Sequence, residues 1–114
     1  MNTVIKDSLA KSLSYDAYRK MVRDLLAEGK STGPNQSVDL LNYSTLNDAR
    51  MNRLDKKTKL TDSSIKALKS TKATQTWLLI TESWCGDAAQ IAPIINKMSL
   101  ESDKVNLKVV LRDE

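Results

Sequence analysis

The sequence predicts an α/β fold in which a parallel β-α-β unit follows a helical N-terminal segment. Two short runs, residues 76–81 and 105–111, are rich in residue types that favour strands. Between them, residues 88–98 carry apolar side chains at helical spacing. A strand, a crossover helix and a second strand make a parallel pair. We expect residues 73–114 to hold this unit and residues 1–72 to form a helical extension that packs on it.

The first helix is expected directly after Ser14, which is a suitable cap. Apolar side chains recur at helical spacing from Tyr15 to Leu26, and Gly29 is expected to end the helix. The first dozen residues are polar and are expected to be mobile or weakly helical.

Two further helices are expected before the first strand. One covers about residues 45–57, because Thr45 and Asp48 resemble a capping box. The other begins near Thr61 or Asp62 and ends in a polar stretch.

The two expected strands differ in pattern. Residues 76–81 form an almost continuous apolar run, which is typical of a strand buried on both faces. Residues 105–111 alternate and then become apolar. A two-stranded parallel pair is unstable alone and leaves an unpaired edge. The preceding helices can cover one face but cannot add strands, so we expect a homo-oligomer formed through this edge, unless the chain is part of a longer protein.

Composition narrows the classes of function. The 114 residues carry a formal charge of +4, which indicates a solvated surface with excess lysine rather than a nucleic-acid module. The start of the chain has no apolar run typical of a signal peptide. No run approaches the roughly 18 apolar residues that a membrane helix needs. We therefore expect a cytoplasmic protein with no membrane partner.

The chain has one cysteine, Cys85, and no histidine. An intramolecular disulfide is impossible, and Ser-His-Asp or Cys-His catalysis within the chain is excluded. We expect no metal and no cofactor. A lone cysteine can be a small buried hydrophobe, a metal ligand whose partners lie on another chain, or a reactive thiol.

Residues 84–90 (WCGDAAQ) stand where the first strand meets the helix, the point at which α/β units usually carry their chemistry. A sulfur at a helix N-cap meets unpaired backbone N–H groups and the positive end of the helix dipole, and both favour thiolate over thiol. Gly86 allows a tight turn that leaves the sulfur uncovered. Cys85 is therefore the candidate nucleophile.

This segment, followed by Pro93 within A-P-I, resembles the thioredoxin signature W-C-G-P-C and its kinked helix. From about Tyr15 onward, the chain resembles a bacterial branch of thioredoxin-like proteins with a helical N-terminal extension. That resemblance includes Tyr43–Leu54, the WCGDAAQ motif and the ending Leu111–Glu114. It implies a partial thioredoxin-like fold.

Departures from the family pattern limit the chemistry that the resemblance implies. Ala88 stands where a dithiol thioredoxin has its resolving cysteine, Asp87 replaces the intervening proline, and Leu79 stands in place of the buried acid. Family members continue into a strand preceded by a cis-proline, but the only prolines here are Pro34 and Pro93. A mixed disulfide at the thiol would need an external thiol for its release.

The resemblance implies a thiol-disulfide oxidoreductase-like activity of monothiol type, with protein thiols or small thiols as partners. The alternative is a non-catalytic interaction module that keeps the fold. Trp84 is expected to shield the site. Asp87 is expected to stabilise the first helical turn, although Glu82 and Asp87 together could also act as paired carboxylates.

A third hypothesis concerns the basic helix over residues 45–59. Its side chains could follow a phosphate backbone, but the expectation is a solvated face with no nucleic-acid partner. The residues concerned are Asn47, Arg50, Asn52, Arg53, Lys56, Lys57 and Lys59.

Overall fold

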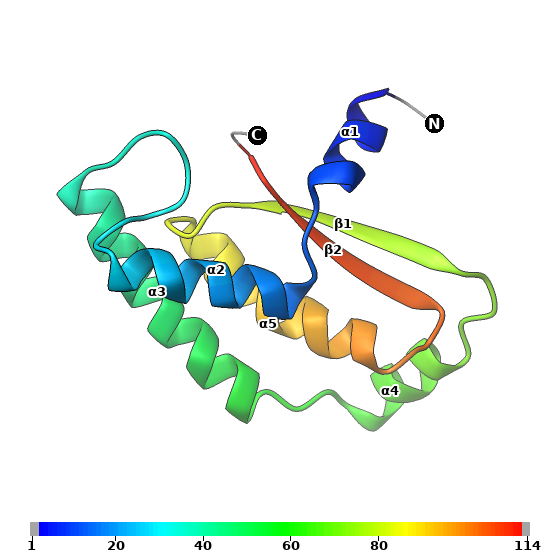
Figure 1. Ribbon diagram of the computed structural model, residues 1–114. Coiled ribbons are helices and arrows are strands. Elements are labelled where there is room, and N and C mark those ends of the chain that lie inside the picture. Colours follow the sequence, from blue (N-terminus) through cyan, green and yellow to red (C-terminus); the bar gives the residue numbers. More distant parts are fainter. Residues whose placement is uncertain (1–2, 113–114) are drawn as a thin grey trace.

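The computed structural model describes residues 3–112. Asp113 and Glu114, which belong to the ending Leu111–Glu114 named above, lie outside the described residues. It is a mixed α/β fold with one parallel sheet (Figure 1). In chain order the elements are α1 (Thr3–Lys11), α2 (Tyr15–Ala27), α3 (Val38–Lys57), α4 (Asp62–Lys69), β1 (Gln75–Thr81), α5 (Gly86–Leu100) and β2 (Val105–Leu111).

The sheet has two parallel strands, which pair from Gln75 with Val105 to Thr81 with Leu111. The predicted β-α-β unit is therefore present. The expectation that the first strand is buried on both faces was wrong, because β1 is mostly half-buried or exposed and Ile80 is 59% exposed. The apolar run at 76–81 thus covers the core with one face only.

The N-terminal half also contributes to the sheet, contrary to expectation. Leu13 forms an isolated antiparallel bridge with Val109 of β2, in which each backbone N–H donates to the partner's carbonyl at 2.7 Å. This bridge lies on the side of β2 away from β1. Within residues 3–112, the outer edge of β1 therefore has fewer backbone hydrogen-bond partners than the outer edge of β2.

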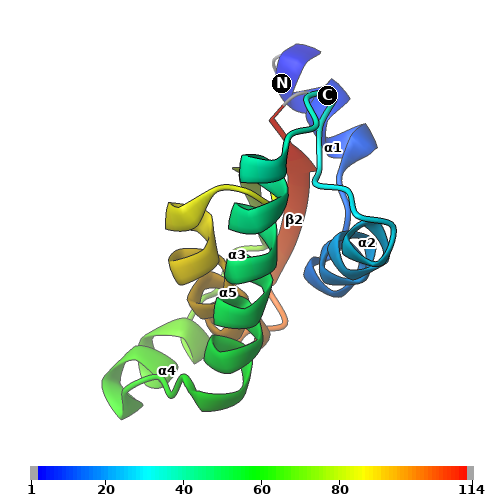
Figure 2. The same ribbon diagram turned by 90° about the vertical axis from the view of Figure 1, so that its left-hand side faces the viewer.

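Helices α2, α3 and α5 pack together beside the sheet, and α3 runs along α5 (Figures 1 and 2). The core lies between α2, α3, α5 and β2. It consists of Tyr15, Tyr18, Val22, Met51, Ala89, Ala92 and Val109. Helix α1 has no buried residue, which fits the polar character of the first dozen positions.

Most of the expected helix boundaries are close to those observed. Ser14 caps α2 by accepting from the N–H of Ala17, and Thr61 caps α4 in the same way with Ser64. Helix α2 ends before Gly29, whose φ of 74° lies in the left-handed region that glycine tolerates.

The expected start of the second helix was wrong by several residues. Helix α3 begins at Val38, where the hydroxyl of Ser37 accepts a hydrogen bond from the N–H of Leu40. Thr45 lies inside the helix, and its hydroxyl donates to the carbonyl of Leu41 at 2.9 Å. The resemblance of Thr45 and Asp48 to a capping box therefore has no capping role.

Candidate functional site

The thiol of Cys85 stands at the N-terminus of α5, as the sequence predicts. Cys85 is the N-cap residue, with an extended backbone (φ −81°, ψ 112°) and a side chain that makes no capping hydrogen bond. Its N–H donates to the carbonyl of Glu82 at 3.1 Å, and its carbonyl accepts from Ala89 at 3.2 Å. These bonds form the turn from β1 into the helix. They involve only the backbone of Cys85, and its half-buried side chain makes no capping hydrogen bond.

A buried polar cluster holds the segment directly before the thiol. The hydroxyl of Thr32 accepts from the N–H of Ser83 at 2.8 Å, and the hydroxyl of Ser83 accepts from the N–H of Thr32 at 3.0 Å. Thr32 also donates to the carboxylate of Glu82. From α3, Ser44 shares a 2.7 Å bond with the hydroxyl of Ser83, and Asn47 donates to its carbonyl at 3.1 Å.

This cluster connects three parts of the chain behind the thiol. Its members are Thr32, Ser44, Asn47, Glu82 and Ser83, and every one is at most 6% exposed. Because buried polar groups are costly unless paired, these bonds fix the position of the 82–85 turn relative to α3 and to the loop that carries Thr32. We call these five residues the polar cluster.

Tyr18 of α2 lies near the same turn. Its ring is 2% exposed, and burial raises the pKa of Tyr18 to about 12. A hydrogen bond with Thr81 acts in the opposite direction, whereas the nearby Glu82 and Cys85 raise the pKa further. The carboxyl of Glu82 and the thiol of Cys85 are therefore close enough to Tyr18 to affect the pKa of its phenol.

Trp84, the residue directly before Cys85 in the turn, packs against Arg112. The guanidinium carbon of Arg112 lies 4.7 Å from the centroid of the Trp84 ring, a cation–π distance. The backbone N–H of Arg112 also donates to the carbonyl of Thr81 at 3.1 Å. Trp84 is thus held near the end of the sheet through Arg112.

The two remaining predicted site residues, Gly86 and Asp87, lie in the first turn of α5. Asp87 is exposed, whereas Glu82 is 2% exposed in the polar cluster, so the two carboxyls lie in different environments. Gly86 has no positive φ, and a Cβ built there would meet nothing within 4 Å. The backbone at Gly86 therefore accommodates other residues.

The basic helix expected over 45–59 does not present its polar residues as one surface. Asn47 is buried in the polar cluster, and Asn52 accepts a hydrogen bond from the buried Arg19. Arg50 and Arg53 border a hollow with Gln90 of α5. The exposed lysines at the end of α3 instead continue into the segment that leads to α4.

Sequence reasoning did not find Thr32, Ser44, Asn47 or Arg112 as parts of this site. They lie 36 to 51 positions from Ser83 or at the far end of β2, so no local spacing connects them to the thiol.

Among residues 3–112, no group of three or more acidic, histidine or cysteine side chains is placed to hold a metal ion. No helix in that range is both long and apolar enough to cross a bilayer.

The parallel β-α-β unit with a cysteine at the first turn of its helix defines a thioredoxin-like α/β protein. The family model described as Thioredoxin matches residues 33–114, which is more than two thirds of the chain. The chain belongs to the thioredoxin family. The match begins in the loop before α3, and it includes α3 and α4 as well as the β-α-β unit. No curated protein and no solved structure matches the chain.

Proposed function

We propose that this protein is a thiol protein of monothiol type, in which Cys85 exchanges with external disulfides. The observation that carries the proposal is the position of its sulfur at the N-cap of α5, half-buried and without a hydrogen bond of its own to the helix. The first turn of a helix has unpaired N–H groups and the positive end of the dipole. An anionic sulfur is favoured there over a neutral one.

The exchange has two steps. The thiolate of Cys85 attacks one sulfur of a disulfide in a small thiol compound or a protein, which forms a mixed disulfide and releases the other sulfur as a thiolate. Since Ala88 offers no second sulfur one turn along the helix, an external thiol then attacks the mixed disulfide. That thiol becomes bonded to the substrate sulfur, and Cys85 leaves as a thiolate.

Three neighbouring groups have distinct roles in this proposal. Trp84, held by Arg112, shields one side of the sulfur and restricts the direction of attack. Asp87 stabilises the first turn of α5 through the helix dipole, although its charge opposes the thiolate. The polar cluster fixes the turn that carries the cysteine.

The second candidate is a non-catalytic interaction module with the same fold. It is favoured by the single cysteine, because the dithiol cycle of a thioredoxin needs two. In this case Cys85 serves as a half-buried packing residue, and the hydrogen bonds around it only maintain the fold.

The rate of mixed-disulfide formation separates the two candidates. The folded protein and the same protein in urea are incubated with oxidised glutathione at neutral pH, and the adduct is followed by intact-mass spectrometry. We expect one adduct per chain, formed faster in the folded protein than in the unfolded one and removed by dithiothreitol. Cys85→Ser should form none. A folded protein that reacts more slowly than the unfolded chain would contradict the proposal and favour the interaction module.

A further inference from the structure

The segment from residue 56 to residue 72 is rich in lysine. Between positions 56 and 72 there are six lysines and one carboxylate, Asp62. This segment is therefore more positive than the whole chain, whose net charge is +4, and the remainder carries slightly more acidic than basic groups. All six lysines are exposed: Lys56, Lys57, Lys59, Lys66, Lys69 and Lys72.

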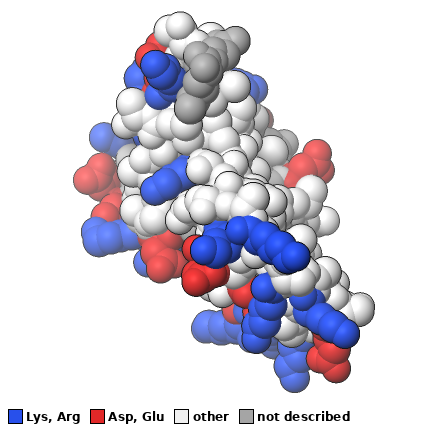
Figure 3. Space-filling view, turned by 90° about the vertical axis from the view of Figure 1, so that its right-hand side faces the viewer, with Lys and Arg blue, Asp and Glu red and all other residues white. Residues whose placement is uncertain are grey.

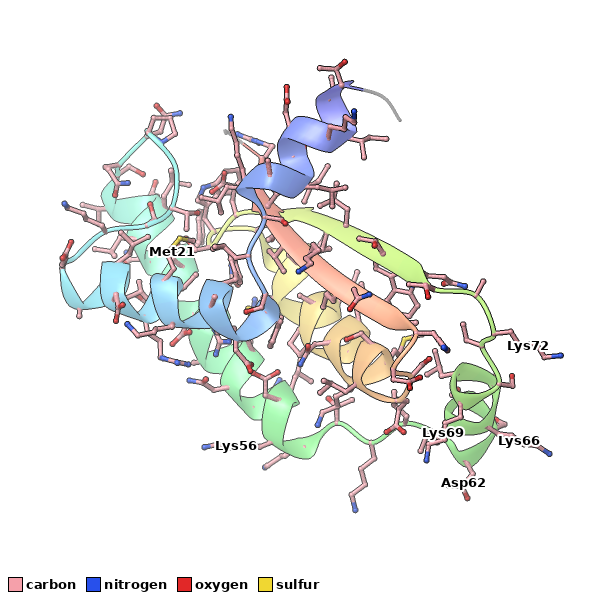
Figure 4. All side chains as sticks on the ribbon, turned by 45° about the vertical axis from the view of Figure 1, so that its right-hand side comes forward. Met21, Lys56, Asp62, Lys66, Lys69 and Lys72 are labelled. Carbon is pink, nitrogen blue, oxygen red and sulfur yellow. The ribbon has the colours of Figure 1, made fainter. Side chains whose placement is uncertain are left out.

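Figure 4 shows Lys66, Lys69 and Lys72 around α4 and the turn after it, and Lys56 at the end of α3. Basic side chains gather over the lower part of the molecule and outnumber the acidic ones there (Figure 3). Lys66 and Lys72 project away from α4 and from the turn that follows it (Figure 4). We call the exposed surface of residues 56–72 the lysine surface.

A hollow of about 420 Å³ opens within this surface, between the α3–α4 linker, α4 and the C-terminal end of α5. Its apolar lining comes from Leu60, Ile65 and Leu100, and Leu100 is 75% exposed. Lys59 and Lys97 border it. Of the carboxylates within residues 3–112, only Glu101 lines this hollow, and it lies 4.0 Å from the ammonium of Lys69.

We propose that this hollow and the lysine surface bind an acidic peptide segment of a partner protein that has an apolar anchor residue. The apolar lining takes the anchor, and the surrounding ammonium groups attract the carboxylates. The surface contains no arginine and no aromatic residue between positions 56 and 72. Base recognition relies on arginine forks and base stacking on aromatic rings, so these absences favour a peptide over a nucleic acid.

The proposed docking site is separate from the thiol and does not depend on its reactivity. Cys85 stands at the first turn of α5, whereas Leu100 ends the same 15-residue helix. At 1.5 Å per residue the two ends lie about 22 Å apart. A partner bound at the lysine surface would therefore leave the thiol accessible.

The test measures binding of a fluorescent synthetic peptide in which pairs of glutamates alternate with leucines, by polarisation with the full chain. Two matched peptides replace the leucines by serines or the glutamates by lysines. We expect the parent peptide to bind, the serine peptide to bind about tenfold more weakly, and the lysine peptide to show no binding. Binding of the parent should weaken as salt is raised.

Two variants of equal charge locate the site. The first changes four lysines of the lysine surface to glutamine: Lys59, Lys66, Lys69 and Lys72. The second makes the same change at four exposed lysines elsewhere: Lys6, Lys11, Lys20 and Lys30. The first should weaken peptide binding by about tenfold or more, and the second by about twofold at most.

A second pair of variants tests the apolar anchor. Leu100→Ser should weaken binding by about tenfold, whereas Val38→Ser, at a comparably exposed position, should leave it unchanged.

Equal weakening by both lysine variants would overturn the proposal. It would also be overturned if single-stranded or duplex oligonucleotides, or vesicles containing phosphatidylglycerol, bound more tightly than the acidic peptide.

Discussion

Ser83 is bonded on three sides, although it is a small residue in a turn. Its N–H donates to Thr32, its hydroxyl accepts from the backbone of Thr32 and shares a bond with Ser44, and its carbonyl accepts from Asn47. At 6% exposure, none of these groups can readily exchange its partner for water. The position of the following Cys85 therefore depends on the Ser83 hydroxyl.

Removing that hydroxyl should be costly. Ser83→Ala leaves the buried N–H of Thr32 without its acceptor and the hydroxyl of Ser44 without this partner, and we expect a loss of about 1–3 kcal/mol in the free energy of unfolding, measured with urea. Ser99→Ala is the matched control, because Ser99 is equally buried but only donates to Asn96 in its own helix. Equal losses in both variants would show that the polar cluster adds no stability.

Tyr18 makes stability depend on pH in the alkaline range. Burial raises its pKa to about 12, from the ordinary value of 10.0. The fold thus favours the neutral phenol, so its contribution is complete below pH 10 and is lost as the pH rises towards 12. A shift of this size corresponds to roughly 2–3 kcal/mol.

The measurement is the free energy of unfolding between pH 9 and 12, compared between variants. Tyr18→Phe removes the titrating group, so its decline over this range should be shallower than that of the unmodified protein. Tyr43→Phe changes a ring that is 55% exposed and should decline in parallel with the unmodified protein. Parallel curves for all three proteins would show that Tyr18 does not cause the loss of stability at alkaline pH.

At the scale of elements, α2 is joined to α3 through one buried arginine. Arg19 is 3% exposed, and its guanidinium bonds to Asp48 and Asn52. Its Nε lies 3.6 Å from Asp55, an ion-pair distance that is too long for a hydrogen bond. Asp55 also accepts from the hydroxyl of Tyr15 at 2.8 Å. These contacts position α3, which in turn supplies Ser44 and Asn47 to the polar cluster.

We expect Arg19→Ala to lower the free energy of unfolding by about 3 kcal/mol, because it leaves two acidic side chains without their buried partner. Lys20→Ala removes a neighbouring ion pair, with Asp24, in which both side chains are more than 60% exposed. That loss should be about 0.5 kcal/mol or less. Chemical denaturation of both variants checks the difference, and similar losses would contradict the structural role of Arg19.

The elements differ in how far the sequence predicts them. The bounds of β2 agree with its apolar pattern, and β1 and α4 agree to within about a residue. The start of α3 was missed because its inward face carries polar side chains, among them Ser44 and Asn47, which interrupt the apolar spacing. The place of Cys85 at a helix N-cap followed from the strand–helix order alone. The polar cluster could not be predicted in this way, because its members come from distant segments and no local sequence pattern shows that these segments pack together.

At the scale of the whole molecule, the free edge of β1 favours self-association. Within residues 3–112, β1 pairs only with β2, and the exposed Ile80 lies near the end of the strand. We expect the average mass from light scattering to rise with protein concentration. Ile80→Lys should keep the protein monomeric, whereas Ile91→Lys, on α5, should associate like the unmodified chain. A constant monomeric mass for the unmodified chain would remove this expectation.

The bridge between Leu13 and Val109 joins residues that are almost a full chain length apart. During synthesis, Leu13 leaves the ribosome long before Val109 is added, so its two backbone hydrogen bonds cannot form until β2 has been made. Contacts of such long sequence separation slow folding. The nascent chain therefore holds α2 and β1 without their contacts to β2 until that strand has been made, and this interval is when a chaperone would have most to bind.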